Sequence, residues 1–191
     1  LDLAVVKFTS QSNYPIAQLG QYSPNTGDII LAGGFPGRDK ISSPLWQWQL
    51  NPGYIYDPEQ GKFETQDRNS FAKGGYDLIY TSISYGGMSG GPVFDTAGRV
   101  IGIHGQAETT EKAEILLGKS QGISIQTFIG IADKLKIKPQ LLKIANNQPA
   151  ELNVTTRRTI ITAMQNLTPP QPGDDGERWL GTSLKIEYQL F

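Results

Sequence analysis

Short apolar runs, bounded by glycine, proline and polar residues, recur over the first 136 positions of the chain. Such runs are too short for helices, and their boundaries are typical of strands and turns. The pattern predicts strands over residues 1–8, 27–36, 45–50, 76–81 and 122–125, and a β-hairpin that joins Val93–Phe94 to Arg99–His104. We therefore expect an all-β fold in this part of the chain.

The strand expected over 45–50 places Trp46, Trp48 and Leu50 on one face and glutamines on the other, which predicts a half-buried strand with the tryptophans packed inside. The polar residues between the runs predict a linker over 9–26, a hairpin with a surface loop over 51–75, and a loop over 107–119.

The pattern changes to a helical period near residue 127. Phe128, Ile131, Ala132 and Leu135 recur at helical spacing, which predicts an amphipathic helix with Thr127 as a possible N-cap. Further along, Ile160, Met164 and Leu167 suggest a second helix, 168–176 a flexible spacer, and 179–191 the start of another module. We expect one domain over 1–136 and a helical and linker appendage of unknown role over 137–191.

Composition narrows the function classes. The 191 residues include 17 Lys and Arg against 18 Asp and Glu, so the charge balance gives no indication of nucleic-acid or anionic-membrane binding. No apolar run is long enough for a transmembrane helix. The absence of cysteine excludes disulfides and zinc–thiolate sites. The first residue is Leu1, and we expect the sequence to be part of a longer product; it does not indicate an oligomeric state.

The stretch Gly86-Gly87-Met88-Ser89-Gly90-Gly91-Pro92 is the strongest candidate for chemistry. Glycine weakens strands, but it allows backbone to adopt unusual dihedral angles and to approach a ligand closely. In this setting the amides of Gly87 and Ser89 can point the same way beside the Ser89 hydroxyl. Two convergent N–H donors and a serine oxygen are the parts of an oxyanion hole and a nucleophile.

The predicted hairpin folds about Thr96–Ala97 and sets Val93 near Val100 or Ile101. Continuing this register places His104 and Gly105 roughly opposite Ser89 and Gly90. The single histidine of the sequence is therefore expected about one strand spacing from the candidate nucleophile.

These residues resemble the active-serine region of trypsin-like serine peptidases, which have a chymotrypsin fold. The Ile-His after the hairpin is most similar to bacterial glutamyl endopeptidases, exfoliative toxins and cyanobacterial trypsin-like peptidases. Met88 departs from the family pattern, because it cannot form the ion pair that activates zymogens. The resemblance implies that the chain holds the second β-barrel, the last part of the first, and carboxy-terminal helices.

The resemblance also extends to Leu1-Asp2-Leu3-Ala4-Val5-Val6, where Asp2 matches the aspartate that orients the catalytic histidine. We expect Asp2 to be partly buried in a strand. In this family the general-base histidine precedes that aspartate, so we expect the base to lie in an amino-terminal half that this sequence lacks. The alternative, His104 as the base, lacks an obvious orienting acid.

By the same resemblance, Ser84 and His104 line the pocket for the side chain before the cleaved bond, and Gly105 and Gln106 pair with substrate backbone. A hydroxyl and an imidazole can both donate to a carboxylate, which favours acidic side chains. We expect no metal and no cofactor to be required.

The sequence predicts a secreted or periplasmic serine endopeptidase that acts on protein or peptide substrates. This chain alone should be inactive, since losing a triad member removes orders of magnitude in rate. Two alternatives stay open: a peptidase-like binding module without catalysis, and a Deg-type quality-control peptidase.

Overall fold

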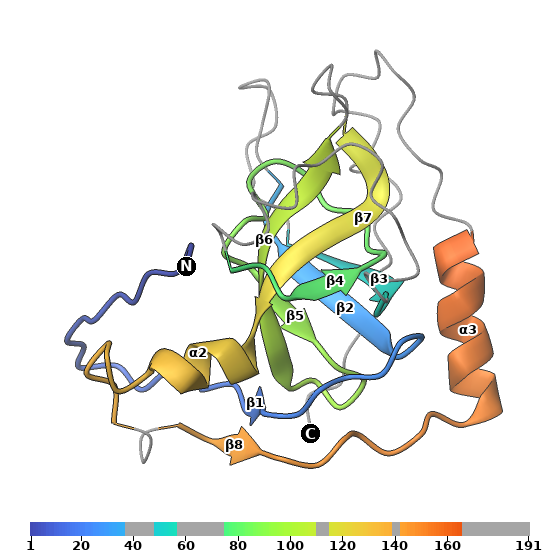
Figure 1. Ribbon diagram of the computed structural model, residues 1–191. Helices are drawn as coiled ribbons and strands as arrows, with labels where there is room; N and C mark the ends of the chain where they lie inside the picture. The colour runs from blue at the N-terminus through green and yellow to red at the C-terminus, as the bar shows by residue number, and fades with distance from the viewer. Residues whose placement is uncertain (37–47, 57–74, 110–114, 139–141, 166–191) are drawn as a thin grey trace.

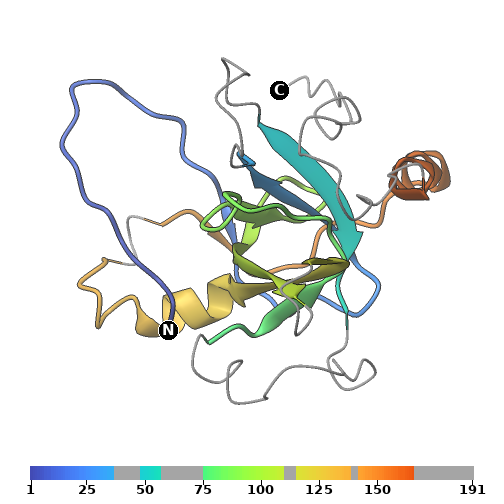
Figure 2. The same ribbon diagram turned by 90° about the horizontal axis from the view of Figure 1, so that it is seen from above.

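The computed structural model describes residues 1–36, 48–56, 75–109, 115–138 and 142–165 (Figure 1). Eight strands and two helices are found there. The strands are β1 Leu19–Gly20, β2 Ile29–Gly34, β3 Gln49–Tyr54, β4 Leu78–Tyr80, β5 Pro92–Phe94, β6 Val100–Thr109, β7 Ile115–Ser124 and β8 Ile144–Ala145. The helices are α2 Ile125–Ile131 and α3 Val154–Gln165, which lie on opposite sides of the strands (Figures 1 and 2).

Six of the strands form a rolled antiparallel sheet in the order β3-β2-β5-β6-β7-β4. No full ladder joins β3 to β4 within the described residues. A single bridge between Ile55 and Tyr80 connects them instead, with a 2.8 Å bond from the Thr81 amide to the Tyr54 carbonyl. The chain is therefore mostly β-sheet and has the predicted chymotrypsin-like barrel architecture.

The core lies inside this roll because alternate residues of each strand point inward. Ala32 of β2 pairs with Val93 of β5, and both are fully buried. One cluster of buried side chains fills the interior: Tyr22, Ile30, Ala32, Ile55, Leu78, Tyr80, Val93 and Ile101.

The segment after α2 returns to the barrel and adds to the sheet. β1 pairs in parallel with both β6 and β8, through Leu19 opposite Val100 and opposite Ile144. Arg99 Nη1 also donates a 2.9 Å bond to the carbonyl of Asn147. The residues over 142–148 are thus in contact with the β-sheet.

The strand expected over 1–8 is wrong. Residues 1–8 form no strand and, apart from half-buried Leu3, are exposed; the segment runs outside the barrel on the side of α2 (Figure 2). An extended segment becomes a strand only when another strand hydrogen-bonds to it, and none of the described strands does so. Asp2 is consequently exposed rather than partly buried.

The strand expected over 45–50 begins later, and its faces are reversed. Residues 45–47 lie outside the described residues, and β3 runs from Gln49 through Pro52 to Tyr54. Gln49 and Asn51 are buried, whereas Leu50 is half-buried and Trp48 is 46% exposed against Phe35. Asn51 is tolerated inside because its side-chain amide donates to the carbonyl of Ile83 at 2.8 Å.

The loop expected over 107–119 is largely strand. β6 extends to Thr109 and β7 starts at Ile115, with Ala107 paired to Ser120. Polar sequence suggested a loop, yet a long hairpin can hold polar residues on its solvent side. Residues 110–114 lie outside the described part.

The first helix starts two residues before the predicted position. Its N-cap is Ser124, whose hydroxyl accepts from the Thr127 amide, so Thr127 is not the cap. Ser124 is held by Asp77, which accepts from both its amide and its hydroxyl, and the sequence pattern does not reveal this tertiary contact. Strands in the regions 27–36, 76–81 and 122–125, and the second helix, are confirmed; Leu167 and the regions 168–176 and 179–191 fall outside the described residues.

Candidate active site

Ser89 lies at the tip of a tight loop between β4 and β5. Gly87 and Gly90 have φ angles of +94° and +85°, which side chains with a Cβ rarely adopt. Between them, Met88 points inward and is only 1% exposed, while Ser89 is exposed to solvent. The glycines therefore turn the chain so that one side chain anchors the loop and the next faces outward.

The backbone amides of this loop fall into two groups. Three of them are bonded: Met88 to the Tyr85 carbonyl at 3.1 Å, Gly91 to the Met88 carbonyl at 3.0 Å, and Gly90 to the His104 carbonyl at 2.8 Å. The amides of Gly87 and Ser89 donate to no partner in the described parts of the chain. A pair of unused N–H donors beside an exposed hydroxyl can hold a developing oxyanion.

Strand β2 supports the loop from below. A Cβ on Gly91 would lie 2.1 Å from the Gly33 carbonyl oxygen, and one on Gly34 would lie 2.9 Å from the Met88 Cβ. Both positions need glycine because backbone and side chain approach too closely for any larger residue. The loop is thereby fixed to a rigid strand, as positioning of a reacting group requires.

His104 lies opposite the loop, as the hairpin pattern predicts. Its amide donates to the Gly91 carbonyl at 2.8 Å, and its carbonyl accepts from Gly90. Nearer the turn the expected register is wrong, because Val93 pairs with Gly102 and a bulge at the next residue shifts the ladder.

The His104 ring is buried and uncharged at neutral pH. His104 is only 2% exposed, and the Tyr80 hydroxyl lies 2.5 Å from its Nδ1. Burial lowers the pKa of His104 to about 4. No carboxylate contacts this ring within the described residues, and Nδ1 is already engaged, so the structure gives no support to His104 as a general base.

Two buried serine hydroxyls extend this polar cluster, and one of them belongs to Ser120, which pairs with Tyr80 across β4 and β7. Ser84 Oγ lies 2.8 Å from Ser120 Oγ, and Ser120 Oγ donates a 2.9 Å bond to the Ser82 carbonyl. Each of these residues is 2% exposed or less. Tyr80 and Ser120 were not singled out in the sequence, although Tyr80, Ser82 and Ser84 share one face of an extended segment, and that period of two was the available signal.

Asp2 is connected to strand β6 through the side chain of Tyr76. Tyr76 donates a 2.5 Å hydrogen bond to Asp2 Oδ2, and burial followed by this bond raises the pKa of Tyr76 to about 12. The Tyr76 ring covers Gly105, where a Cβ would lie 2.0 Å from the ring. Asp2 is thus linked to the residue directly after His104.

Gln106 donates from its side chain to the Gln121 side chain at 3.1 Å, beside Gly105 on β6. Beyond His104, β6 pairs only with β7 among the described strands. The opposite edge of β6 is therefore unpaired by any described strand at this point, and an unpaired edge is what a bound extended peptide needs.

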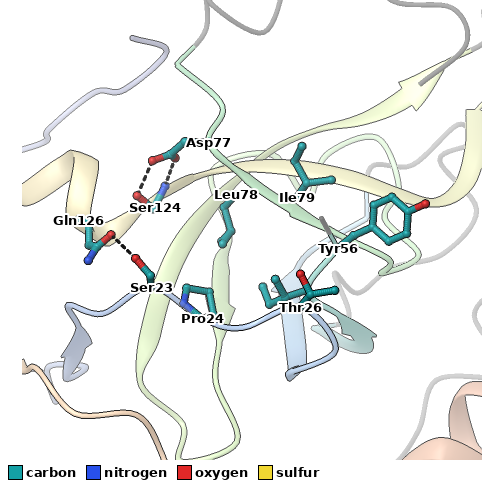
Figure 3. A pocket seen from close by; sticks show the side chains of 10 residues that line it. Ser23, Pro24, Thr26, Tyr56, Asp77, Leu78, Ile79, Ser124 and Gln126 are labelled. Atoms are coloured by element: carbon teal, nitrogen blue, oxygen red, sulfur yellow. Dashed lines mark hydrogen bonds between the residues drawn. The ribbon is translucent and has the colours of Figure 1, made fainter. Parts of the chain in front are cut away.

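Two cavities lie away from this loop. One, about 220 Å³, lies between Pro24, Tyr56 and Leu78 and is bordered by the bonded pair Asp77 and Ser124 (Figure 3). The other, about 280 Å³, lies between the β1–β2 connection and residues 148–157. Neither is lined by a residue of the Ser89 loop or by His104.

Residues 1–103 match the trypsin-like peptidase domain. The chain belongs to this trypsin-like peptidase family. The match includes the Ser89 loop, β5 and the first residues of β6, and it agrees with the serine peptidase resemblance seen in the sequence. No curated protein matches this trypsin-like chain significantly.

Solved structures similar to this peptidase chain include a variant of the HtrA-type protease AlgW with a tripeptide, at TM-score 0.48 and 22% identity over 66% of this chain and 38% of that one. The protein Rv3671c from M. tuberculosis H37Rv, in an inactive form, is similar at TM-score 0.44 and 16% identity over 64% of this chain and 54% of that one. The trypsin-like chain thus spans about half or less of these proteins.

Within the ranges that the structure covers, no helix is long and apolar enough to cross a membrane. The same residues contain no group of three or more His, Cys, Asp or Glu side chains arranged to hold a metal ion.

Proposed function

We propose that this protein is a serine endopeptidase in which Ser89 is the nucleophile. The observation that supports this most directly is the loop geometry: an exposed Ser89 hydroxyl between two glycines of positive φ, beside the unbonded amides of Gly87 and Ser89. A structural turn would use its amides internally, whereas a catalytic loop keeps donors for the substrate.

In the proposed reaction, Ser89 Oγ attacks the scissile carbonyl carbon while its proton passes to a general base. The carbonyl oxygen becomes negative and is held by the amides of Gly87 and Ser89. Collapse breaks the C–N bond, the amine leaves with the proton from the base, and an acyl-enzyme remains. Water then hydrolyses the ester by the same steps and regenerates Ser89.

We propose that Asp2 orients a histidine supplied by chain outside this sequence. Its carboxylate already accepts from Tyr76, whose ring lies on Gly105, so it is anchored beside the strand that pairs with the Ser89 loop. The second carboxylate oxygen, Oδ1, has no partner among the described residues and is available to an imidazole N–H.

We further propose that Gly105 and Gln106 pair with the substrate backbone at the open edge of β6. Ser84 and His104 then face the side chain before the cleaved bond, and that side chain carries a hydrogen-bond acceptor, as acidic and carboxamide side chains both do. Protein or peptide segments are the substrates, and a secreted or periplasmic location stays a prediction.

The test uses the full-length protein and a fluorophosphonate probe, which esterifies only an activated serine. Mass spectrometry should find the label on Ser89, and Ser89→Ala should abolish both labelling and peptide hydrolysis. Ser12→Ala, an exposed serine in the segment before β1, is the matched control and should label normally. Full hydrolysis by Ser89→Ala would overturn the mechanism.

The alternatives are separable in the same experiment. A peptidase-like binding module would bind peptides without labelling or hydrolysis. A Deg-type quality-control peptidase would label at Ser89 but cleave after small apolar residues rather than after residues with a polar acceptor.

A further inference from the structure

The hydrogen atoms of the buried polar cluster can be assigned from its hydrogen bonds. Tyr80 is fully buried, and His104 Nδ1 is the only described partner of its hydroxyl. If Nδ1 carried the proton, the Tyr80 hydrogen would have no acceptor, which is costly in a buried site. Tyr80 therefore donates to Nδ1, and the neutral ring carries its proton on Nε2.

The Nε2 proton of His104 is available to a ligand. Among the described residues, the buried side-chain nitrogens and oxygens without a partner are Arg99 Nη2 and Gln121 Nε2. His104 Nε2 has no partner among the residues that the structure describes, yet it is not one of these enclosed atoms, so it is not shut off from solvent. The ring thus offers one N–H donor from an otherwise buried position.

Ser84 offers an acceptor instead of a donor. Ser120 has one hydroxyl hydrogen, and it is used on the Ser82 carbonyl. In the 2.8 Å contact between the two hydroxyls, Ser84 must then be the donor. With its hydrogen directed to Ser120, Ser84 presents lone pairs to anything that binds beside it.

With Ser84 and His104 facing one side chain, as the proposed function has them, one N–H donor and one hydroxyl acceptor match a primary carboxamide, which carries a C=O acceptor and an N–H donor. A carboxylate has only acceptors, so it would bond to His104 but face the lone pairs of Ser84. The hydrogen bonds of Ser84, Ser120, Tyr80 and His104 among the described residues involve no lysine or arginine, so these residues supply no cation to compensate for a desolvated carboxylate.

We propose that the pocket to which the proposed function assigns Ser84 and His104 selects an uncharged carboxamide side chain, glutamine above all, and that Tyr80 and Ser120 are positioning residues that fix this choice. The inference rests on the proposed function, since it concerns the residue before the cleaved bond. In this proposal the substrate side chain is recognised by one hydrogen-bond donor and one acceptor of the protein, and not by its charge.

The proton assignment can be tested without any catalysis. The sequence contains a single histidine, so long-range ¹H–¹⁵N NMR correlations report the tautomer of His104 alone. The spectrum at pH 7.5 should show the Nε2–H tautomer, and Tyr80→Phe should give a mixture of tautomers. A Nδ1–H tautomer or an imidazolium in the unaltered protein would overturn the proposal.

Specificity is tested on the full-length protein with two peptides that differ only in glutamine or glutamate before the cleaved bond. At pH 7.5, kcat/KM should favour glutamine by about tenfold, the effect of one well-placed hydrogen bond. Ser120→Ala frees the Ser84 hydrogen and should shift the ratio about tenfold toward glutamate, while the exposed control Ser23→Ala leaves it unchanged. A glutamate preference above tenfold in the unaltered protein would overturn the proposal.

Binding separates this proposal from the proposed function. Peptide amides that end in Gln-NH₂ or Glu-NH₂ are titrated against Ser89→Ala, and tighter binding of the glutamine peptide is expected. Tighter binding of the glutamine peptide, without hydrolysis by the unaltered protein, would contradict the proposed peptidase function and support the proposed glutamine selectivity. Hydrolysis together with equal binding of the two peptides would contradict the glutamine selectivity and support the peptidase function.

Discussion

The two ends of the β5–β6 hairpin hold buried polar groups in opposite ways. At the turn, Asp95 accepts from the amides of Ala97 and Arg99, from Arg99 Nε at 2.7 Å, and from the Tyr22 hydroxyl at 2.8 Å. At the other end, His104 is neutral, and among the described residues only one of its ring nitrogens has a partner. The turn uses its carboxylate fully, whereas the open end keeps donors unused.

This difference distinguishes polar groups that stabilise the fold from polar groups that are available to a substrate. Burying the Asp95 charge is tolerated because a cation and three further donors compensate for its lost hydration. At the Ser89 end, the Gly87 and Ser89 amides and His104 Nε2 have no partner in the part of the chain that the structure describes, so a substrate can supply what is missing. Compensation of a buried charge within the protein, more than burial itself, distinguishes the two ends, although Arg99 Nη2 at the turn is a buried donor without a partner among the described residues.

The largest stability effect is expected at the turn. Asp95→Ala removes the partner of Arg99, which is only 6% exposed, and leaves a buried unpaired charge. We expect a loss of roughly 3–5 kcal/mol in the free energy of unfolding, measured by urea denaturation. The exposed control Asp133→Asn should change it by less than about 0.5 kcal/mol. A loss below about 1 kcal/mol for Asp95→Ala would show that the turn is not held by this network.

At the open end, the stability of the protein should depend on pH through His104. The unfolded chain binds the histidine proton near its ordinary pKa of about 6.5, but the folded chain does so only near pH 4. Stability is therefore complete above pH 6.5 and falls as pH decreases toward 4, by at most roughly 3 kcal/mol.

The measurement compares urea denaturation between pH 7.5 and 4.5 for the protein and for His104→Gln, whose side-chain amide can still accept from Tyr80. Carboxylates titrate in both proteins, so the difference between the two curves isolates the histidine. Parallel curves would mean that the folded ring titrates normally, and the contrast between the two ends would be lost.

Much of this contrast could be read from the sequence, and the part that could not has a physical cause. The glycines around Ser89 and the turn at Asp95–Gly98 are local signals, because dihedral preference acts within a few residues. The partners Tyr80 and Ser120 come from two other strands, so only the register of the folded sheet brings them to His104 and Ser84. The strand predicted over 1–8 is wrong for the same reason, because an apolar run does not reveal whether a neighbouring strand is present to pair with it.

A steric test of the open end comes next in size. Gly105→Ala places a methyl group 2.0 Å from the Tyr76 ring, which must move and weaken its bond to Asp2. We expect a loss of about 2 kcal/mol in unfolding free energy and a lower kcat for the full-length protein. Gly130→Ala, with open space in α2, is the control and should not destabilise the protein. An unchanged kcat would show that Asp2 and Tyr76 do not contribute to the proposed active site.

The two smallest effects are expected when a single tyrosine hydroxyl is removed. Tyr22→Phe removes one of the donors to Asp95 while keeping the ring under the Arg99 guanidinium, 5.2 Å from its centroid. A hydrogen bond to a buried charged group contributes about 1.5–3 kcal/mol, and the remaining donors reduce the loss toward the lower value. Urea denaturation should show this loss without a change in slope. Tyr80→Phe is the matched comparison at the open end, where a neutral bond is removed and about 1 kcal/mol or less is expected. If Tyr80→Phe were the more destabilising of the two, the hydroxyl of Tyr80 would serve the fold more than the substrate.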